Sequence, residues 1–222
     1  MEPHWNLTLL PELQTTKQTN QPWPLGWRDR TCIMGVINVT PDSFSDGGEY
    51  LEPLEALERS SELLTEGADV LDIGGQSTRP FAVEIDAKEE LRRLKPALFE
   101  IRRSNPNVLI SIDTFLAEVA LECLGIGANW INDISGGRRD SKMLNVVAEA
   151  GCPFVLTHSR GNSQTMNQLA KYRQVTQDVI DGLKRRTDEA LKVGVDSKNI
   201  IWDPGIGFAK TTEDNIQILK YL

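Results

Sequence analysis

The stretch VLISID (108–113) decides the fold, because it is a short, mostly apolar run that ends in the carboxylate of Asp113. Runs of this length and composition are typical of strands buried on both faces. Five other stretches of the chain follow the same plan. They are CIMGVIN (32–38), DVLDIG (69–74), NWINDI (129–134), PFVLTH (153–158) and NIIWDP (199–204).

Longer amphipathic stretches separate these runs. The clearest are Pro53–Glu66, Asp86–Arg103 and Leu169–Val193, which carry apolar residues at i, i+3, i+4 and i+7. Strands that alternate with helices imply βαβ units and a parallel sheet. We therefore predict six βα units.

The polar residues at the strand ends select among parallel folds. One or two of them could serve only as helix caps. Six in succession indicate a ring of functional groups at the mouth of a barrel, whereas a doubly wound sheet gathers its ligands at one crevice. We therefore predict a TIM (β/α)8 barrel. The strand-end residues are Asn38, Asp72, Asp113, Asn132 with Asp133, His158 and Asp203.

A closed barrel of this type needs eight units, and the sequence supplies six. The sequence stops at Leu222, inside a pattern (Thr212–Leu222) that is typical of a helix. We expect a truncated or partial barrel rather than a complete six-unit domain. Residues 1–30 are polar and rich in Trp and Pro, so we assign them to an N-terminal extension and residues 31–222 to the barrel domain.

Composition excludes several classes of protein. The formal net charge of −8 argues against a nucleic-acid binder, which needs an excess of Lys and Arg. Two histidines are too few for a site built from His ligands, and no apolar run could span a bilayer. The three cysteines are widely spaced, so we expect free thiols in a reducing cytoplasm.

Four glycine-containing loops follow strands and indicate ligand contact at one end of the sheet. None of them has the spacing of a Walker A loop, a dinucleotide-binding loop or a nucleophile elbow, so nucleotide hydrolysis, dinucleotide binding and serine acyl transfer are not expected. The loops comprise residues 38–48, 74–80, 135–137 and 203–211.

From residue 32 to the end, six sequence blocks resemble the signature blocks of dihydropteroate synthases. This family folds as a TIM barrel and displaces diphosphate from (7,8-dihydropterin-6-yl)methyl diphosphate with the amine of 4-aminobenzoate. The resemblance thus implies these two small molecules as substrates. The blocks are IMGVINVTPDSFSDGG (33–48), DIGGQSTRP (72–80), SIDT (111–114), INDISGG (131–137), THSRG (157–161) and DPGIGFAK (203–210).

By this resemblance, Asp113, Asn132 and Asp203 would hold the pterin, whose N–H donors suit carboxylate and carboxamide acceptors. Thr78 and Lys210 would contact the pterin diphosphate. Asn38 matches the position that contacts magnesium in the family. Since Mg²⁺ usually relies on substrate phosphates, one side-chain oxygen is a sufficient protein contribution.

The resemblance also assigns residues to the aminobenzoate side of the site. Phe44 and Pro80 would enclose the ring, and we hypothesise that Asp46 and Arg79 pair to close their loops over the substrates. The family usually has Gly where this chain has Phe81, so the second loop is expected to be stiffer.

No side chain is assigned as a catalytic nucleophile. Loss of diphosphate would leave a cationic centre, so positioning and electrostatics would carry catalysis. For His158 we expect an anion contact or a structural role rather than that of a base.

The family's Lys-bearing seventh strand and Arg-x-His eighth strand have no counterpart in these 222 residues. If the molecule ends at Leu222, we expect poor stability and little or no turnover. The family also implies a homodimer. Two alternatives remain open: a pterin-binding methyltransferase barrel and a catalytically inactive pterin-binding fragment.

Overall fold

The computed structural model describes residues 22–40, 53–79 and 81–221. They form one parallel six-stranded sheet whose strands lie in sequence order, β1 to β6. Helices alternate with the strands, as the sequence predicts. The strands are β1 (Met34–Asn38), β2 (Val70–Gly74), β3 (Leu109–Asp113), β4 (Trp130–Asp133), β5 (Phe154–Thr157) and β6 (Ile200–Asp203). The α-helices are α1 (Pro53–Thr65), α2 (Ala87–Ser104), α3 (Ala117–Ile126), α4 (Met143–Ala150), α5 (Val175–Lys192) and α6 (Thr212–Lys220). The described residues also contain two 3₁₀ turns, η4 (Met166–Leu169) and η5 (Ser197–Asn199).

The sequence placed two of the three clearest helices within one or two residues of their ends. The third, α5, begins six residues later than the predicted start at Leu169. Leu169 belongs instead to a short 3₁₀ turn, and the chain is extended at Gln174 just before the helix. A helical apolar pattern therefore continued across a break in the backbone that periodicity alone does not reveal.

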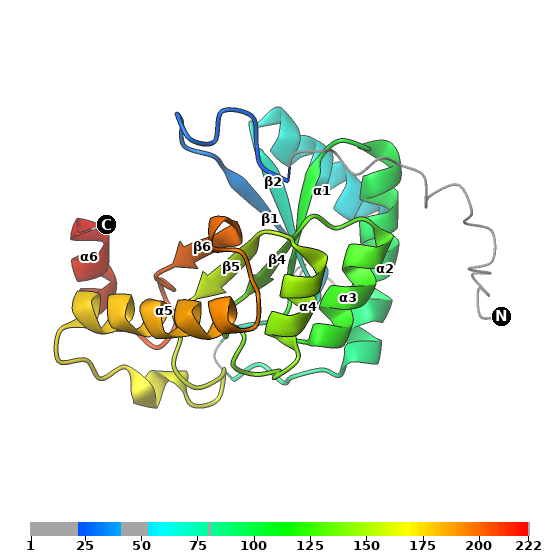
Figure 1. Cartoon of the computed structure of the whole chain (residues 1–222). Helices are drawn as coiled ribbons and strands as arrows, with labels where there is room; N and C mark the ends of the chain where they lie inside the picture. Colours follow the sequence, from blue (N-terminus) through cyan, green and yellow to red (C-terminus); the bar gives the residue numbers. More distant parts are fainter. Residues whose placement is uncertain (1–21, 41–52, 80, 222) are drawn as a thin grey trace.

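Alternate residues of each strand face two different environments. Residues such as Ile73 and Ile112 point outward and pack against the helices in the main core. Their neighbours point inward, where Val70, Leu109 and Trp130 form a separate apolar cluster. Figure 1 shows α1 to α4 side by side along the outer flank of the strands, with α5 across β5 and β6. This order and this sidedness confirm the predicted barrel-type fold; within the described residues β1 and β6 are the edges of the sheet and do not pair.

The amino-terminal end of the inner face is covered by the segment that precedes β1. The Trp23 ring lies edge-on to Trp130, with 5.3 Å between ring centroids, and stacks on Trp27 at 4.6 Å. The Trp130 indole N–H donates to the carbonyl of Pro22. This described part of the N-terminal extension thus forms an apolar base, while the opposite end of the inner face stays polar.

Candidate active site at the carboxyl ends of the strands

Three of the predicted strand-end residues, Asn38, Asp113 and Asn132, form one row across the sheet together with Gly74. Asn38 pairs in register with Gly74, Gly74 with Asp113, and Asp113 with Asn132. A methyl group on Gly74 would lie 3.4 Å from Asn38 Oδ1 and 3.5 Å from Asp113 Oδ2. The absence of a side chain at Gly74 therefore lets the Asn38 carboxamide and the Asp113 carboxylate approach each other on the inner face.

Asp72 lies two residues before Gly74 and faces the same side of the sheet, fully buried. The Asn132 amide Nδ2 donates to Asp72 Oδ2 at 2.9 Å, which fixes the orientation of the carboxamide. Burial raises the pKa of Asp72, and nearby Ser111 and Asn132 counter this only in part. Asp72 Oδ1 and Asn132 Oδ1 are buried without a hydrogen bond of standard geometry in the described part of the chain. This end of the sheet is thus rich in acceptors that a ligand with N–H groups could satisfy.

Asp113 sits at the centre of a group of carboxylates. Its pKa is raised well above its ordinary value, first by burial and then by the negative charges of Asp72, Glu90, Asp133 and Asp203. These groups repel one another, so the site favours a ligand that donates hydrogen bonds or develops positive charge.

Asp203 reaches the same face from β6. One carboxylate oxygen accepts from the backbone N–H of Gly205 at 2.7 Å, and the other accepts from the Thr157 hydroxyl at 3.2 Å. Thr157 is also its partner in the strand register. The loop after β6 therefore fixes the rotamer of Asp203, which combines a turn-forming role with a place at the site.

Lys210 is held by its own loop in this structure, and its contact with the pterin diphosphate stays a prediction. Its ammonium donates to the carbonyls of Gly205, Phe208 and His158 at 2.9–3.1 Å and also lies 3.2 Å from His158 Nδ1. Burial lowers the pKa of Lys210 to about 8. In this structure Lys210 joins the loop after β6 to the end of β5, a role that its place in a glycine-containing loop did not reveal.

His158 packs outside the sheet, away from the row of acceptors. A methyl group on Gly182 of α5 would lie 2.6 Å from His158 Cδ2, so the ring fills the space that this glycine leaves. Burial, followed by the charges of Lys210, Arg160 and Arg138, lowers the pKa of His158 to about 3. A neutral, packed imidazole agrees with the expected structural role.

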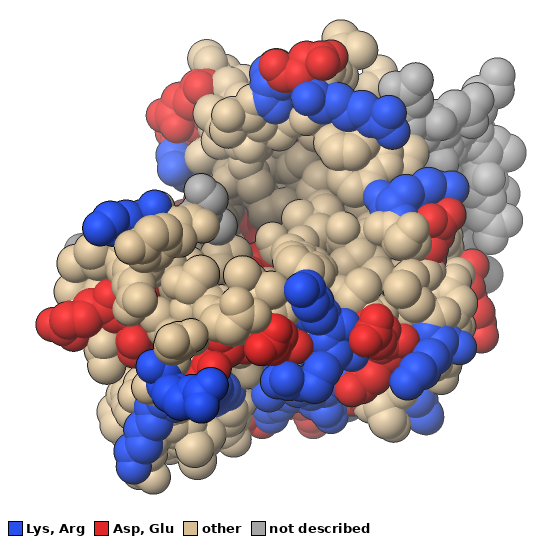
Figure 2. Space-filling model, turned by 60° about the vertical axis from the view of Figure 1, so that its left-hand side comes forward, with Lys and Arg blue, Asp and Glu red and all other residues tan. Residues whose placement is uncertain are grey.

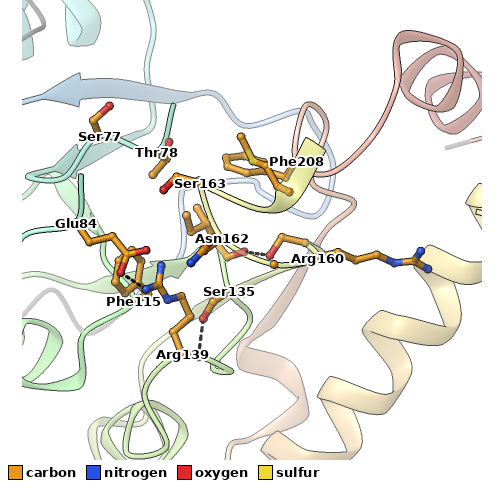
Figure 3. A pocket seen from close by; sticks show the side chains of 14 residues that line it. Ser77, Thr78, Glu84, Phe115, Ser135, Arg139, Arg160, Asn162, Ser163 and Phe208 are labelled. Carbon is orange, nitrogen blue, oxygen red and sulfur yellow. Dashed lines mark hydrogen bonds and ion pairs between the residues drawn. The ribbon is translucent and has the colours of Figure 1, made fainter. Parts of the chain in front are cut away.

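A pocket lies between the loops that follow β2, β3, β4, β5 and β6 (Figure 3). Thr78 is half-buried and lines it, whereas Arg79 is exposed. The substrate contact of Thr78 stays a prediction. The side chains labelled in the close-up are Ser77, Thr78, Glu84, Phe115, Ser135, Arg139, Arg160, Asn162, Ser163 and Phe208.

Several predicted site residues cannot be compared with the structure. Phe44, Asp46 and Pro80 lie outside the described residues, and with them the hypothesised pairing of Asp46 with Arg79. Arg79 accepts one backbone hydrogen bond from Ala82 N–H, at 3.1 Å. Their assignment to the aminobenzoate side stays a prediction.

Few of the described side chains are placed to bind a metal ion. Among the described residues, no group of three or more His, Cys, Asp or Glu side chains is placed to hold a metal ion. Asn38 Oδ1 faces the inner side of the sheet next to Asp113. This arrangement fits a magnesium ion held by one carboxamide oxygen, with the remaining ligands from substrate and water.

The charged surface carries both signs. On the face in Figure 2, Lys and Arg groups alternate with Asp and Glu groups, and the surface is hollowed near the top of the view. No helix within the described ranges is long and apolar enough to cross a membrane.

The structure adds residues that the sequence did not single out for the site. Asp72 was predicted as a strand-end residue but not as the partner of Asn132; its place two residues before Gly74 is the signal that would have shown a shared face. Glu90, Arg139 and Ser163 gave no such signal, because a helix face and two loops bring them to the site.

Comparison with known proteins gives one consistent result. A sequence profile described as "Pterin binding enzyme" matches residues 34–222. The chain is 44% identical over 206 residues to a dihydropteroate synthase of Synechocystis, a match that covers 90% of this chain and 71% of that protein. It is also 48% identical over 200 residues to a mitochondrial folate synthesis bifunctional protein of Pisum sativum, covering 88% of this chain and 39% of that protein.

Comparison with solved structures finds the same family. A dihydropteroate synthase of Xanthomonas albilineans, solved with 4-aminobenzoic acid, superposes with a TM-score of 0.79 at 39% identity. The match covers 87% of this chain and 68% of that one. The chain therefore spans about two-fifths of the bifunctional relative and about two-thirds of the single-function relatives.

Proposed function

The chain belongs to the dihydropteroate synthase family of pterin-binding enzymes, and on that premise we propose that it joins a pterin diphosphate to 4-aminobenzoate. The products would be 7,8-dihydropteroate and diphosphate. The observation that carries this proposal is the convergence of Asn38, Asp113 and Asn132 in one row on the inner face, with Asp203 on the same side.

The acceptors suit the pterin ring. Its pyrimidine edge presents N–H donors, and Asp113 and Asp203 offer carboxylate oxygens. The Asn132 amide nitrogen donates one of its two hydrogens to Asp72, so its second hydrogen and Oδ1 remain for a ligand. Charge-assisted bonds of this kind contribute roughly 1.5–3 kcal/mol each.

The same carboxylates would promote departure of the leaving group. The C–O bond to diphosphate breaks and the diphosphate keeps the electron pair, which leaves positive charge on the pterin methylene. That charge relieves the mutual repulsion of Asp113, Asp72 and Asp203, so the site stabilises it before any nucleophile arrives. The amine lone pair of 4-aminobenzoate then forms the new C–N bond, and the amine proton passes to water.

Magnesium forms part of this proposal. Asn38 Oδ1 would hold the ion together with oxygens of the substrate diphosphate. When bound, Mg²⁺ would neutralise charge on the departing diphosphate. We also propose a reducing, cytoplasmic setting, since the three cysteines are free thiols and two of them are buried.

Calorimetry with the pterin diphosphate, with and without Mg²⁺, tests the proposal before any turnover assay. We expect Asp113→Asn to weaken binding roughly 10- to 100-fold, the equivalent of one or two charge-assisted hydrogen bonds. Asn38→Ala should remove most of the magnesium dependence. Ser61→Ala, which deletes a hydroxyl bonded within α1, is the matched control and should bind as the parent does.

The outcomes separate the candidate functions. Binding that is unchanged in Asp113→Asn would refute the assignment of the site. Tight binding followed by pteroate formation supports the synthase, tight binding without product supports a pterin-binding protein, and methyl transfer from methyltetrahydrofolate to a corrinoid would identify a methyltransferase instead.

A further inference from the structure

The loop after β2, which carries Thr78, is tied to the loop after β5 by three hydrogen bonds. Phe81 N–H donates to the Ser163 carbonyl at 3.0 Å, and the Ser163 hydroxyl donates to the Ala82 carbonyl at 3.0 Å. The Gln164 amide also donates to the Ala82 carbonyl, at 3.2 Å. We call these four residues the loop latch. It joins segments about 80 residues apart in the sequence.

The backbone at Phe81 is shaped for this contact. Phe81 has φ of 68°, in the left-handed region that residues with side chains avoid. Its ring is 68% exposed, so packing of the side chain does not account for the conformation. The strained turn directs the Phe81 N–H and the Ala82 carbonyl toward the same residue, Ser163. Strain that is retained at a loop beside a binding site points to a role in positioning.

The fifth-strand loop is a firm support for the latch. Asn162 Oδ1 accepts hydrogen bonds from the backbone N–H groups of Gln164 and Thr165 and from the Thr165 hydroxyl. The next residue, Met166, is buried and begins η4. Ser163 is therefore held by a local turn that does not depend on the second loop.

A second contact holds the far side of the same loop. Glu84 pairs with Arg139 from the loop after β4, and the Arg139 guanidinium lies 4.0 Å above the centroid of the Phe115 ring. The Ile85 N–H donates to Gln76 Oε1 at 2.7 Å, which closes the loop on itself. The second loop is thus fixed on both sides of Phe81, and Thr78 keeps its place in the pocket wall (Figure 3).

We infer that Ser163 is a positioning residue, which holds the second loop so that Thr78 faces the diphosphate end of the substrate. This inference rests on the proposed function. It assigns to Ser163 no contact with the reacting atoms: the residue acts through the backbone of Phe81 and Ala82. The pterin ring, held by side chains of the strands, is independent of the latch.

The inference predicts a split between two ligands. The double variant Ser163→Ala/Gln164→Ala loses both side-chain bonds of the latch and keeps the backbone bond. The dissociation constant for (7,8-dihydropterin-6-yl)methyl diphosphate with Mg²⁺ should rise roughly tenfold, as expected for the loss of one or two net hydrogen bonds. The dissociation constant for 6-hydroxymethyl-7,8-dihydropterin, which lacks the diphosphate, should stay within about twofold of the parent's value. The single variant Ser163→Thr keeps a hydroxyl and the native Gln164. Its dissociation constant for the pterin diphosphate should equal that of the parent.

Hydrogen exchange supplies a readout that needs no ligand. The amide of Phe81 should exchange faster in the double variant than in the parent, whereas amides of β3 should not change. Ser61→Ala serves again as the control for loss of a hydroxyl. Equal weakening of both ligands, or no weakening of either, would overturn the inference. A parent protein that binds neither ligand would instead refute the proposed function, even if the exchange measurement shows the latch.

Discussion

Among the described residues, Phe81 and Ala209 have a positive φ despite carrying a side chain, and Phe81 has the larger value, 68°. Its positive φ explains why the dihydropteroate synthase resemblance leads one to expect Gly there, since Gly adopts this conformation without strain. The ring is largely exposed, so little apolar contact is lost when it is removed. The position therefore isolates the effect of the backbone.

We predict that Phe81→Gly is more stable than Phe81→Ala by about 1 kcal/mol, because both variants lose the ring but only Gly relieves the strain. Urea unfolding of the two variants under identical conditions measures the difference. Equal stability, or a more stable Ala variant, would show that the backbone at this position is not strained in solution.

The positions of individual site residues could be predicted from the sequence where the residues lie at the ends of strands. Asn38, Asp113, Asn132 and Asp203 follow from one rule, since parallel strands end at the same edge of a sheet and alternate residues share a face. Lys210 shows the limit of this rule. A loop residue can direct a long side chain either to the site or back to its own loop, and only the positions of the carbonyls of Gly205, Phe208 and His158 decide between them.

At the scale of the elements, the end of α2 depends on one buried cation. Arg102 has no carboxylate partner in the described chain and donates instead to the carbonyls of Pro106 and Val108 through Nη1. Through Nη2 it donates to the Gly127 carbonyl and to Asn129 Oδ1, both at 2.8 Å. The planar guanidinium thereby joins the end of α2 to the starts of β3 and β4.

Arg102→Lys should lower the free energy of unfolding by roughly 2–4 kcal/mol, because one ammonium cannot reach both sets of acceptors and leaves buried groups unpaired. Chemical denaturation measures the loss. The control is Arg103→Lys at the next position, where the side chain is exposed and pairs only with Glu100; its effect should stay below about 0.5 kcal/mol. Comparable losses in the two variants would contradict this account of α2.

The elements themselves were predicted better than their boundaries. Six apolar runs located the six strands. The central strands β2 to β5 are largely buried on both faces, which keeps their sequences apolar, whereas the edge strands β1 and β6 expose Val36 and Trp202. The start of α5 was misplaced because the 3₁₀ turn at Met166–Leu169 keeps a helical apolar pattern. The edges β1 and β6, which do not pair within the described residues, agree with the expected partial barrel, since the sequence supplies six of the eight units that closure needs.

For the molecule as a whole, the buried acids make stability depend on pH. Glu90 of α2 is fully buried, and burial raises its pKa from 4.5 to about 7, with Thr114 and Arg93 opposing the shift. The folded protein therefore retains this proton between about pH 4.5 and 7 while the unfolded chain has lost it. The stabilising effect of the retained proton is complete below pH 4.5 and disappears as the pH rises through 7.

Glu90→Gln cannot ionise, so it should gain stability relative to the parent as the pH rises. We expect the difference between the two free energies of unfolding to grow by roughly 2–3 kcal/mol between pH 4.5 and pH 8. Denaturation at several pH values measures this difference, in which the opposite contribution of His158 cancels because both proteins contain it. A difference that does not vary with pH would show that Glu90 is ionised in both states.

The strand order described above has a consequence for synthesis of the chain. Within the described residues, each strand pairs with the one made just before it, and none of these strands inserts between two earlier ones. A chain leaving the ribosome can therefore add one βα unit at a time to a growing edge, and each unit finds its template already in place. The acceptor row is completed in the same order, so Asn38, Gly74, Asp113 and Asn132 come together before the last strand has emerged.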